Sequence, residues 1–295
     1  MTPSAIVILA AVQVGPALPG DPNAVPTLPQ QPRRAAAQAA PDRGDAPATA
    51  PEISSRLERC LSVIATNPAE ALSAASSWQT ETGGAARAQA GHCAGLALVQ
   101  LGRFAEAKAA FIAAQKDAVG KDPAYAARLG GLAGNAALLD GDGAEAVTLL
   151  DAARTEALKA GEQELALGLQ LDAAAARAQL GQLAEAQASM SAAREVWPQN
   201  AEVWLLSAML SRGVGDLAGA QALIERAAQL APRAPQVALE AGIIAALDGR
   251  IDAARQSWQS VLTVAPGTPM AQTAQSYLGQ LDGAAAPAAA EPASR

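Results

Sequence analysis

Histidine, cysteine and aromatic residues are scarce in this chain. Of its 295 residues one is histidine, two are cysteine and 3% are aromatic. A single histidine excludes mechanisms that need two imidazoles, and two cysteines are too few for a disulfide-built fold or a cysteine-rich metal protein. The formal net charge is −7, with 21 basic against 28 acidic residues. This balance argues against a nucleic-acid-binding protein, because such proteins gather cations against phosphates.

Alanine, in contrast, is very abundant. It occupies 79 positions, more than a quarter of the chain, while β-branched residues are few. Alanine is the best helix former, and it has no side chain with which to fill the face of a sheet. The composition therefore predicts an all-α protein whose helices pack at close range.

The N-terminal segment differs from the rest of the chain. Residues 5–14 form an apolar run of ten, which as a helix would span about 15 Å, half of a bilayer core, and so cannot cross a membrane. Gly15-Pro16-Ala17 follows, a small-x-small sequence that is typical of a signal-peptide cleavage site. We therefore expect residues 1–17 to be a signal peptide and the protein to be periplasmic. Because no lysine or arginine precedes the run, a cytoplasmic protein with an apolar tail is the alternative.

Two low-complexity segments flank a central body. Residues 18–51 contain eight prolines, which remove backbone donors and fix φ, so neither helix nor sheet can propagate there. This composition predicts an extended linker. Residues 284–295 are rich in alanine and proline, and we expect a disordered tail. The folded body is therefore expected to comprise residues 52–283.

The body contains an internal repeat. Five glycines with similar surroundings are spaced by 39, 40, 34 and 34 residues: Gly102, Gly141, Gly181, Gly215 and Gly249. Alanine stands five residues after each glycine, a small residue seven before it, and a large apolar residue nine after it. This pattern predicts pairs of helices joined at the glycine, in which a small residue of the first helix faces a large residue of the second. One pair cannot bury its apolar stripe alone, so the pairs are expected to stack.

This arrangement resembles the tetratricopeptide repeat (TPR) family, whose unit is a helix–turn–helix of 34 residues. The resemblance covers about residues 53–283 and is clearest over 201–234 and 235–268. It implies an all-α solenoid of about five repeats, with a partial unit before them and a capping helix after them. Extra residues near 120–123 and 161–164 are expected to lengthen helices or a loop. The capping helix is expected to end near Leu281, before Gly283.

The two cysteines are the clearest candidates for a covalent link. By repeat position, Cys60 and Cys93 lie three residues apart on neighbouring, nearly parallel helices. If the protein is exported, a disulfide is the favoured interpretation, and two buried thiols are the alternative. His92 is adjacent to Cys93, so the two side chains point about 100° apart on a helix and no metal site is predicted.

Sequence features of an enzyme are missing. No Gly-x-Ser-x-Gly turn follows a strand, and the glycine-rich segment 130–134 falls inside an expected helix without a lysine for phosphate binding. Close helix packing explains those glycines better. We therefore predict a non-enzymatic protein without a cofactor.

The resemblance implies a concave groove that is lined by the first helix of each pair. Carrying the pattern over to this sequence gives the candidate partner-binding residues His92, Leu96, Arg128, Asn135, Leu171, Asp172, Leu205, Met209, Arg212, Leu239 and Ile243. Gln89, Glu202 and Gln236 lie on the same helices and are expected to face the groove as well. Such a mixture of apolar and charged groups suits a bound peptide or protein. Ordinary packing between helices is the alternative for the apolar positions, because groove and core positions differ by one residue.

The predicted function is a scaffold or adaptor that binds a protein or peptide partner, and the resemblance makes the bacterial cell envelope a plausible setting. No nucleic acid and no membrane insertion are expected. The alternatives are a structural protein that self-assembles into homo-oligomers and a cytoplasmic adaptor of the same fold.

Overall fold

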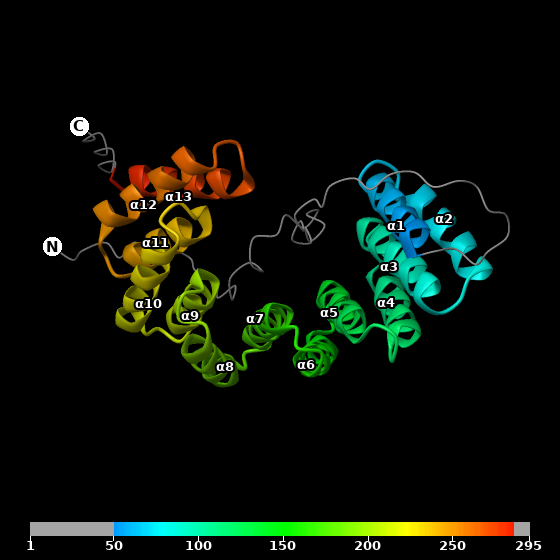
Figure 1. The fold of residues 1–295 in the computed structure, drawn as a ribbon. Helices are drawn as coiled ribbons and strands as arrows, with labels where there is room; N and C mark the ends of the chain where they lie inside the picture. Colours follow the sequence, from blue (N-terminus) through cyan, green and yellow to red (C-terminus); the bar gives the residue numbers. More distant parts are fainter. Residues whose placement is uncertain (1–49, 286–295) are drawn as a thin grey trace, which may run out of the picture. The chain divides into compact units, whose positions relative to one another are not determined.

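A computed structural model describes residues 50–285, which form thirteen α-helices and no strand (Figure 1). The all-α prediction is therefore confirmed for this part of the chain. It divides into two compact units, residues 50–180 and residues 181–285, here called the N-terminal and C-terminal units. The predicted signal peptide, most of the predicted linker and most of the predicted tail lie outside the described residues.

Seven helices make up the N-terminal unit: α1 (Ala50–Ile64), α2 (Pro68–Glu81), α3 (Gly84–Gln100), α4 (Phe104–Ala118), α5 (Pro123–Leu139), α6 (Gly143–Lys159) and α7 (Gln163–Gln179). They pack in hairpins, α1 with α2, α3 with α4 and α5 with α6. The second helix of each hairpin also packs against the first helix of the next, so the hairpins stack in chain order.

Six helices make up the C-terminal unit: α8 (Leu183–Val196), α9 (Ala201–Gly213), α10 (Leu217–Leu230), α11 (Pro235–Leu247), α12 (Ile251–Val264) and α13 (Pro269–Ala285). Here α9 pairs with α10 and α11 with α12, while α8 packs on α9 and α13 on α12. Both units are thus built by the same stacking rule, which the repeat in the sequence predicted.

All five predicted turn glycines have a positive φ, between 71° and 86°. Only glycine adopts this left-handed conformation without steric cost. At Gly102 the turn is closed by two hydrogen bonds, in which the Gly102 N–H donates to the Val99 carbonyl at 3.0 Å and the Arg103 N–H donates to the Leu98 carbonyl at 2.9 Å. This pattern satisfies carbonyl groups that the end of α3 leaves without helical partners. The turns between paired helices therefore lie at the five glycines that the sequence predicted.

The recurring small and large residues form the core between the helices of each hairpin. The alanines five residues after the glycines and the large residues nine after them are all buried. Opposite the large residues, small residues allow the helices to approach closely: Gly134 packs against Leu150, and Gly242 against the indole of Trp258. In the glycine-rich segment of α5, Gly130 packs against Gln115 of α4 and Ala153 of α6, so close packing accounts for these glycines as well.

The extra residues of the middle repeats lengthen helices rather than a loop. Helices α5, α6 and α7 each have 17 residues, whereas α9 and α11 have 13 and α10 and α12 have 14.

The ends of the folded body differ slightly from the prediction. Helix α1 begins at Ala50, two residues before the expected boundary, and together with α2 it forms a whole hairpin rather than a partial unit. Helix α13 continues through Gly283 to Ala285, two residues into the predicted tail. A glycine inside a helix costs only about 1 kcal/mol, and the alanines that follow favour the helix, so Gly283 does not end it.

The last helix has the two-sided character of a cap. Ala271, Ala274 and Leu281 of α13 are buried, whereas Gln272, Gln275, Ser276 and Gln280 are exposed. A polar outer face lets a stack of repeats end in water.

Candidate binding surface

The first helices of the repeats, here called A helices, share a stripe of accessible positions. Thirteen residues before each turn glycine the side chain is exposed or half-buried, and six residues before it most are half-buried. The two positions are seven residues apart and therefore lie on one face of a helix. Each unit therefore has its own surface of this kind, here called its A face: Gln89, Arg128, Asn135, Gly168 and Ala175 in the N-terminal unit, and Glu202, Met209, Gln236 and Ile243 in the C-terminal unit.

Four of the predicted partner-binding residues are in the core instead. His92, Leu96, Leu171 and Leu205 have exposed fractions of 2%, 7%, 7% and 6%. They fill the space between helices, which is the packing alternative that the sequence left open. Leu171 illustrates the reason, because the adjacent Asp172 is half-buried, and a shift of one residue exchanges the two environments.

His92 is held beneath the A face by aromatic neighbours. Its Nδ1 lies 2.8 Å from the Tyr125 hydroxyl, and its ring centroid lies 5.7 Å from that of Tyr125 and 6.3 Å from that of Phe111. Burial, together with the positive charge of Arg128, lowers the pKa of His92 to about 4, so the imidazole is neutral at physiological pH. Burial also raises the pKa of Tyr125. Among the described residues, neither His92 Nε2 nor Gln89 Oε1 has a hydrogen-bond partner, although both are buried.

Arg128 is the unpaired cation of the A face in the N-terminal unit. It is half-buried on α5, and none of the side chains that the structure describes forms an ion pair with it. The basic residues of the two neighbouring A helices are paired: Arg87 of α3 with Asp117, and Arg177 of α7 with Asp151. A half-buried guanidinium without a carboxylate favours an anionic ligand.

Asn135 and Asp172, both predicted as binding residues, are brought together by the stack. The Asn135 Nδ2 group donates a hydrogen bond to Asp172 Oδ2 at 3.0 Å, which joins α5 to α7. Nearby, Gly168 of α7 has nothing within 4 Å of the place where a β-carbon would stand. A backbone can therefore approach this helix closely. The sequence pattern could have indicated Gly168, because it occupies the same repeat position as Arg128.

The C-terminal unit has a more apolar A face. Met209 and Ile243 of this face, and Leu239 one turn before Ile243, are half-buried and pack against the two core clusters of the unit. Arg212, which the sequence suggested as a charge for a partner, instead forms an ion pair with Glu240, in which Nε lies 2.5 Å from Oε1. Only 6% of the Glu240 side chain is exposed, so Arg212 neutralises a buried carboxylate and joins α9 to α11.

Cys60 and Cys93 lie on α1 and α3, and the stack places them within reach of each other. Their Cα atoms are 6.2 Å apart, inside the range that a disulfide requires, and the structure joins them as a disulfide. The pairing is the one that the repeat positions predicted.

Two further features of residues 50–285 concern metal binding and the crossing of a membrane. No cluster of three or more histidine, cysteine, aspartate or glutamate side chains is arranged to hold a metal ion there. Nor does any helix of that range combine the length and apolar character that crossing a bilayer requires.

Comparison with known proteins gives a likeness in structure. No protein-family model and no curated protein matches the sequence. The structure is similar to that of PilW, a type IV pilus biogenesis factor, with a TM-score of 0.58 and 15% identity over 76% of this chain and 98% of PilW. It is also similar to TTC0263, a TPR protein of Thermus thermophilus, with a TM-score of 0.52 and 22% identity over 65% of this chain and 98% of that one.

A third similar structure is PilF of Pseudomonas aeruginosa, with a TM-score of 0.51 and 16% identity over 76% of this chain and 97% of PilF. At these identities the likeness concerns the fold. Together with the helical hairpins and their five turn glycines, it leads to one conclusion: the chain has the tetratricopeptide repeat fold.

Proposed function

We propose that this protein is a non-enzymatic scaffold that binds peptide or protein segments on the A faces of its two units. The observation that carries the proposal is Arg128, a half-buried cation with no ion pair among the described residues, whereas Arg87 and Arg177 of the neighbouring A helices are paired. A carboxylate of the partner would complete this site. Open space above Gly168 gives the partner's backbone room to approach α7.

The A face of the C-terminal unit suits a different part of a partner. Met209 and Ile243 of this face, together with the neighbouring Leu239, provide half-exposed apolar surface, and Glu202 is exposed near the start of α9. Apolar anchors supply affinity, while charges set the position of the bound segment. We therefore propose that this unit binds apolar side chains and the N-terminal unit an acidic group.

We further propose that the protein is exported to the periplasm of a bacterium and acts in the cell envelope. Support comes from the apolar run of residues 5–14 with its small-x-small sequence, and from two cysteines placed for a disulfide, since disulfides persist in oxidising compartments. PilW, which has a similar fold, is a pilus biogenesis factor. N-terminal sequencing of the mature protein is expected to begin near residue 18, and a chain that begins at Met1 or Thr2 would contradict export.

The binding surface can be mapped with a photo-crosslinking residue in the cells that naturally produce the protein. Gln89, Gly168, Glu202 and Gln236 are accessible positions of the two A faces, and Ala113, Ala152 and Ala222 are exposed controls on α4, α6 and α10. We expect discrete adducts from the first set and none from the second. The same adducts from both sets, or none from the A faces, would remove these surfaces as binding sites.

A charge reversal tests the role of Arg128 directly. Arg128→Glu is expected to weaken the N-terminal adducts by about tenfold, because it replaces an attraction for a carboxylate with a repulsion. Arg154→Glu is the matched control, since Arg154 on α6 is also half-buried and has no ion pair among the described side chains. Equal loss in both variants would mean that Arg128 has no specific role in binding.

A further inference from the structure

The first hairpin lacks the large side chain that fills every other packed hairpin. Aligning α2 with α4 by their first residues, Pro68 and Phe104, places Ala75 where α4 has Phe111. The same alignment places Arg59 of α1 where α3 has a glycine, Gly95. In the other packed hairpins the position of Ala75 holds a large side chain: Phe111, Leu150, Ile224 or Trp258.

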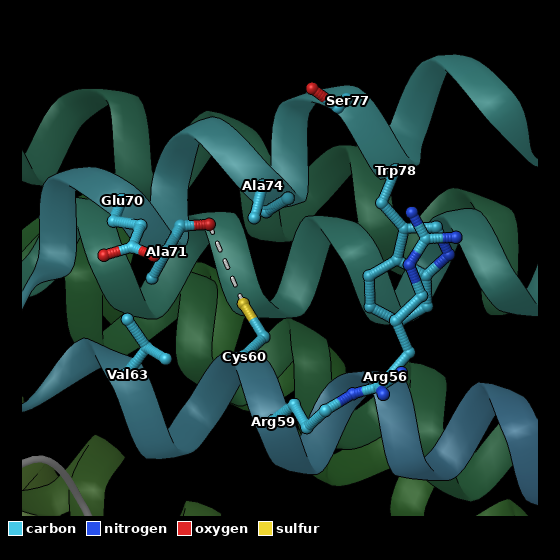
Figure 2. Close-up of a pocket in the computed structure, with 10 residues that line it drawn as sticks. Arg56, Arg59, Cys60, Val63, Glu70, Ala71, Ala74, Ser77 and Trp78 are labelled. Atoms are coloured by element: carbon cyan, nitrogen blue, oxygen red, sulfur yellow. Dashed lines mark hydrogen bonds between the residues drawn. The ribbon is translucent and has the colours of Figure 1, made fainter.

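A pocket remains where that side chain is absent. It has a volume of about 340 Å³ and lies between α1 and α2. Figure 2 shows Cys60 and Val63 of α1 facing Ala71 and Ala74 of α2 across it. Cys60 Sγ lies 3.8 Å from the Ala71 carbonyl oxygen, and its disulfide to Cys93 ties this wall to α3. The lining is therefore largely apolar and held in place.

Charged groups surround the mouth of the pocket. The Arg56 guanidinium lies over the Trp78 ring (Figure 2), 5.0 Å from its centroid, and is paired with Glu81 at 2.7 Å. Glu70 accepts a hydrogen bond from the Asn67 side chain at 2.8 Å. Arg59 is exposed and has no ion pair among the residues whose side chains are described. The mouth thus presents one cation, Arg59, and one anion, Glu70, neither of which has an ion pair among the described side chains.

The surrounding helices leave the pocket open. Helix α3 is the one described helix that packs against both α1 and α2. The exposed large apolar residues of the described part of this chain are all leucine or valine, so a second copy presents no aromatic ring there. An aromatic ring, such as the one that Phe111 provides to the next hairpin, has to come from another polypeptide.

We propose that this pocket binds an aromatic side chain of a partner polypeptide that carries a carboxylate within one helical turn of the aromatic residue. The ring takes the place that the large residue holds in the other hairpins, and the carboxylate pairs with Arg59. Aromatic anchors that enter a preformed pocket are the usual centre of a protein interface. The site lies on the first hairpin and is separate from the A-face positions.

Two alanine-based helical peptides test the proposal with the full-length protein. One carries a phenylalanine and a glutamate a helical turn apart, and in the other the phenylalanine is replaced by alanine. Binding is followed by nuclear magnetic resonance through the indole N–H signal of Trp78, a residue that lines the pocket. We expect the first peptide to bind at least about tenfold more tightly than the second. Equal binding, or none, would overturn the proposal.

Substitutions in the protein locate the bound ring. Ala75→Phe fills the pocket and is expected to weaken binding of the phenylalanine peptide by about tenfold or more. Ala113→Phe, at an exposed alanine of α4, is the matched control and is expected to leave binding unchanged. Unchanged binding by a folded Ala75→Phe variant would show that the ring binds elsewhere.

A second variant keeps the test decisive if Ala75→Phe does not fold. Arg59→Glu alters only an exposed charge, and it is expected to reverse the preference between the peptide with glutamate and a version with lysine in its place. Retention of the original preference would overturn the assigned role of Arg59. Arg128→Glu on the A face is expected to leave peptide binding intact, which separates this site from the proposed scaffold surface.

Discussion

A β-carbon on Gly134 of α5 would stand 2.7 Å from Cγ of Leu150 on α6. Such a distance is shorter than van der Waals contact, and the atom concerned is a branch point rather than the flexible end of a side chain. The close approach of α5 and α6 therefore depends on the absence of one methyl group.

The first prediction compares this glycine with another in the same unit. Gly134→Ala is expected to lower the free energy of unfolding by about 1 kcal/mol or more, because overpacking costs more than alanine gains as a helix former. Gly168→Ala is expected to raise it by about 1 kcal/mol, since that position of α7 has open space around it. Urea denaturation followed by circular dichroism measures both. A stabilising Gly134→Ala would show that α5 and α6 separate without cost.

The second prediction concerns the disulfide between Cys60 and Cys93. The bond closes a loop with a sequence separation of 33, for which the chain-entropy model gives about 3 to 4 kcal/mol of stabilisation. Reductant is therefore expected to lower the denaturation midpoint of the wild-type protein. The double variant Cys60→Ala, Cys93→Ala is the control and should not respond to reductant. Intact mass spectrometry of the native protein that finds two free thiols would refute the bond.

The third prediction follows from the buried imidazole. His92 is the one histidine of the chain, so its ring protons can be followed individually by nuclear magnetic resonance. Burial holds the pKa of His92 at about 4 instead of 6.5, and the signal is expected to stay unchanged until the pH approaches 4. A midpoint near 6.5 would contradict the burial.

The lowered pKa of His92 also makes the free energy of unfolding depend on pH. Above pH 6.5 the imidazole is neutral in the folded and the unfolded chain. As the pH falls from 6.5 to 4, the unfolded chain binds a proton that the folded chain excludes, so stability is lost over this window, by about 3 kcal/mol in total. The variant His92→Gln should lack this component, and equal pH dependence of both proteins would exclude it.

The fourth prediction addresses the pair of Arg212 and Glu240. Only 19% of the Arg212 side chain and 6% of the Glu240 side chain are exposed. Arg212→Ala is expected to lower the free energy of unfolding by about 3 kcal/mol, because it leaves a buried carboxylate without a counter-charge. Arg103→Ala, which breaks the exposed pair with Glu106, is expected to change the free energy of unfolding much less, because water screens exposed ion pairs. Equal effects would mean that water reaches Glu240.

Much of the fold could be predicted because glycines and alanines at fixed repeat positions indicate where helices turn and where they pack closely. Glycine at 102, 141, 181, 215 and 249 marks a backbone conformation that other residues avoid, so the position of each hinge follows from residue identity alone. The pairing of Cys60 with Cys93 followed in the same way, since repeat positions on adjacent helices translate directly into neighbours in space.

The surface was harder to predict, because one residue along a helix turns the side chain by 100°. Leu171 and Asp172 are neighbours in the sequence, but only Asp172 is half-exposed. Likewise, the charge of Arg212 looks available in the sequence, and only the packing of α9 on α11 shows that Glu240 neutralises it.

Local sequence thus determined where helices begin, turn and end, because caps, hinges and close contacts depend on the size and backbone freedom of single residues. Tertiary packing decided which charges are paired, which leucines are covered, and that Ala75 leaves space between α1 and α2. These properties depend on side chains from different helices meeting in space, which no single segment of the chain specifies.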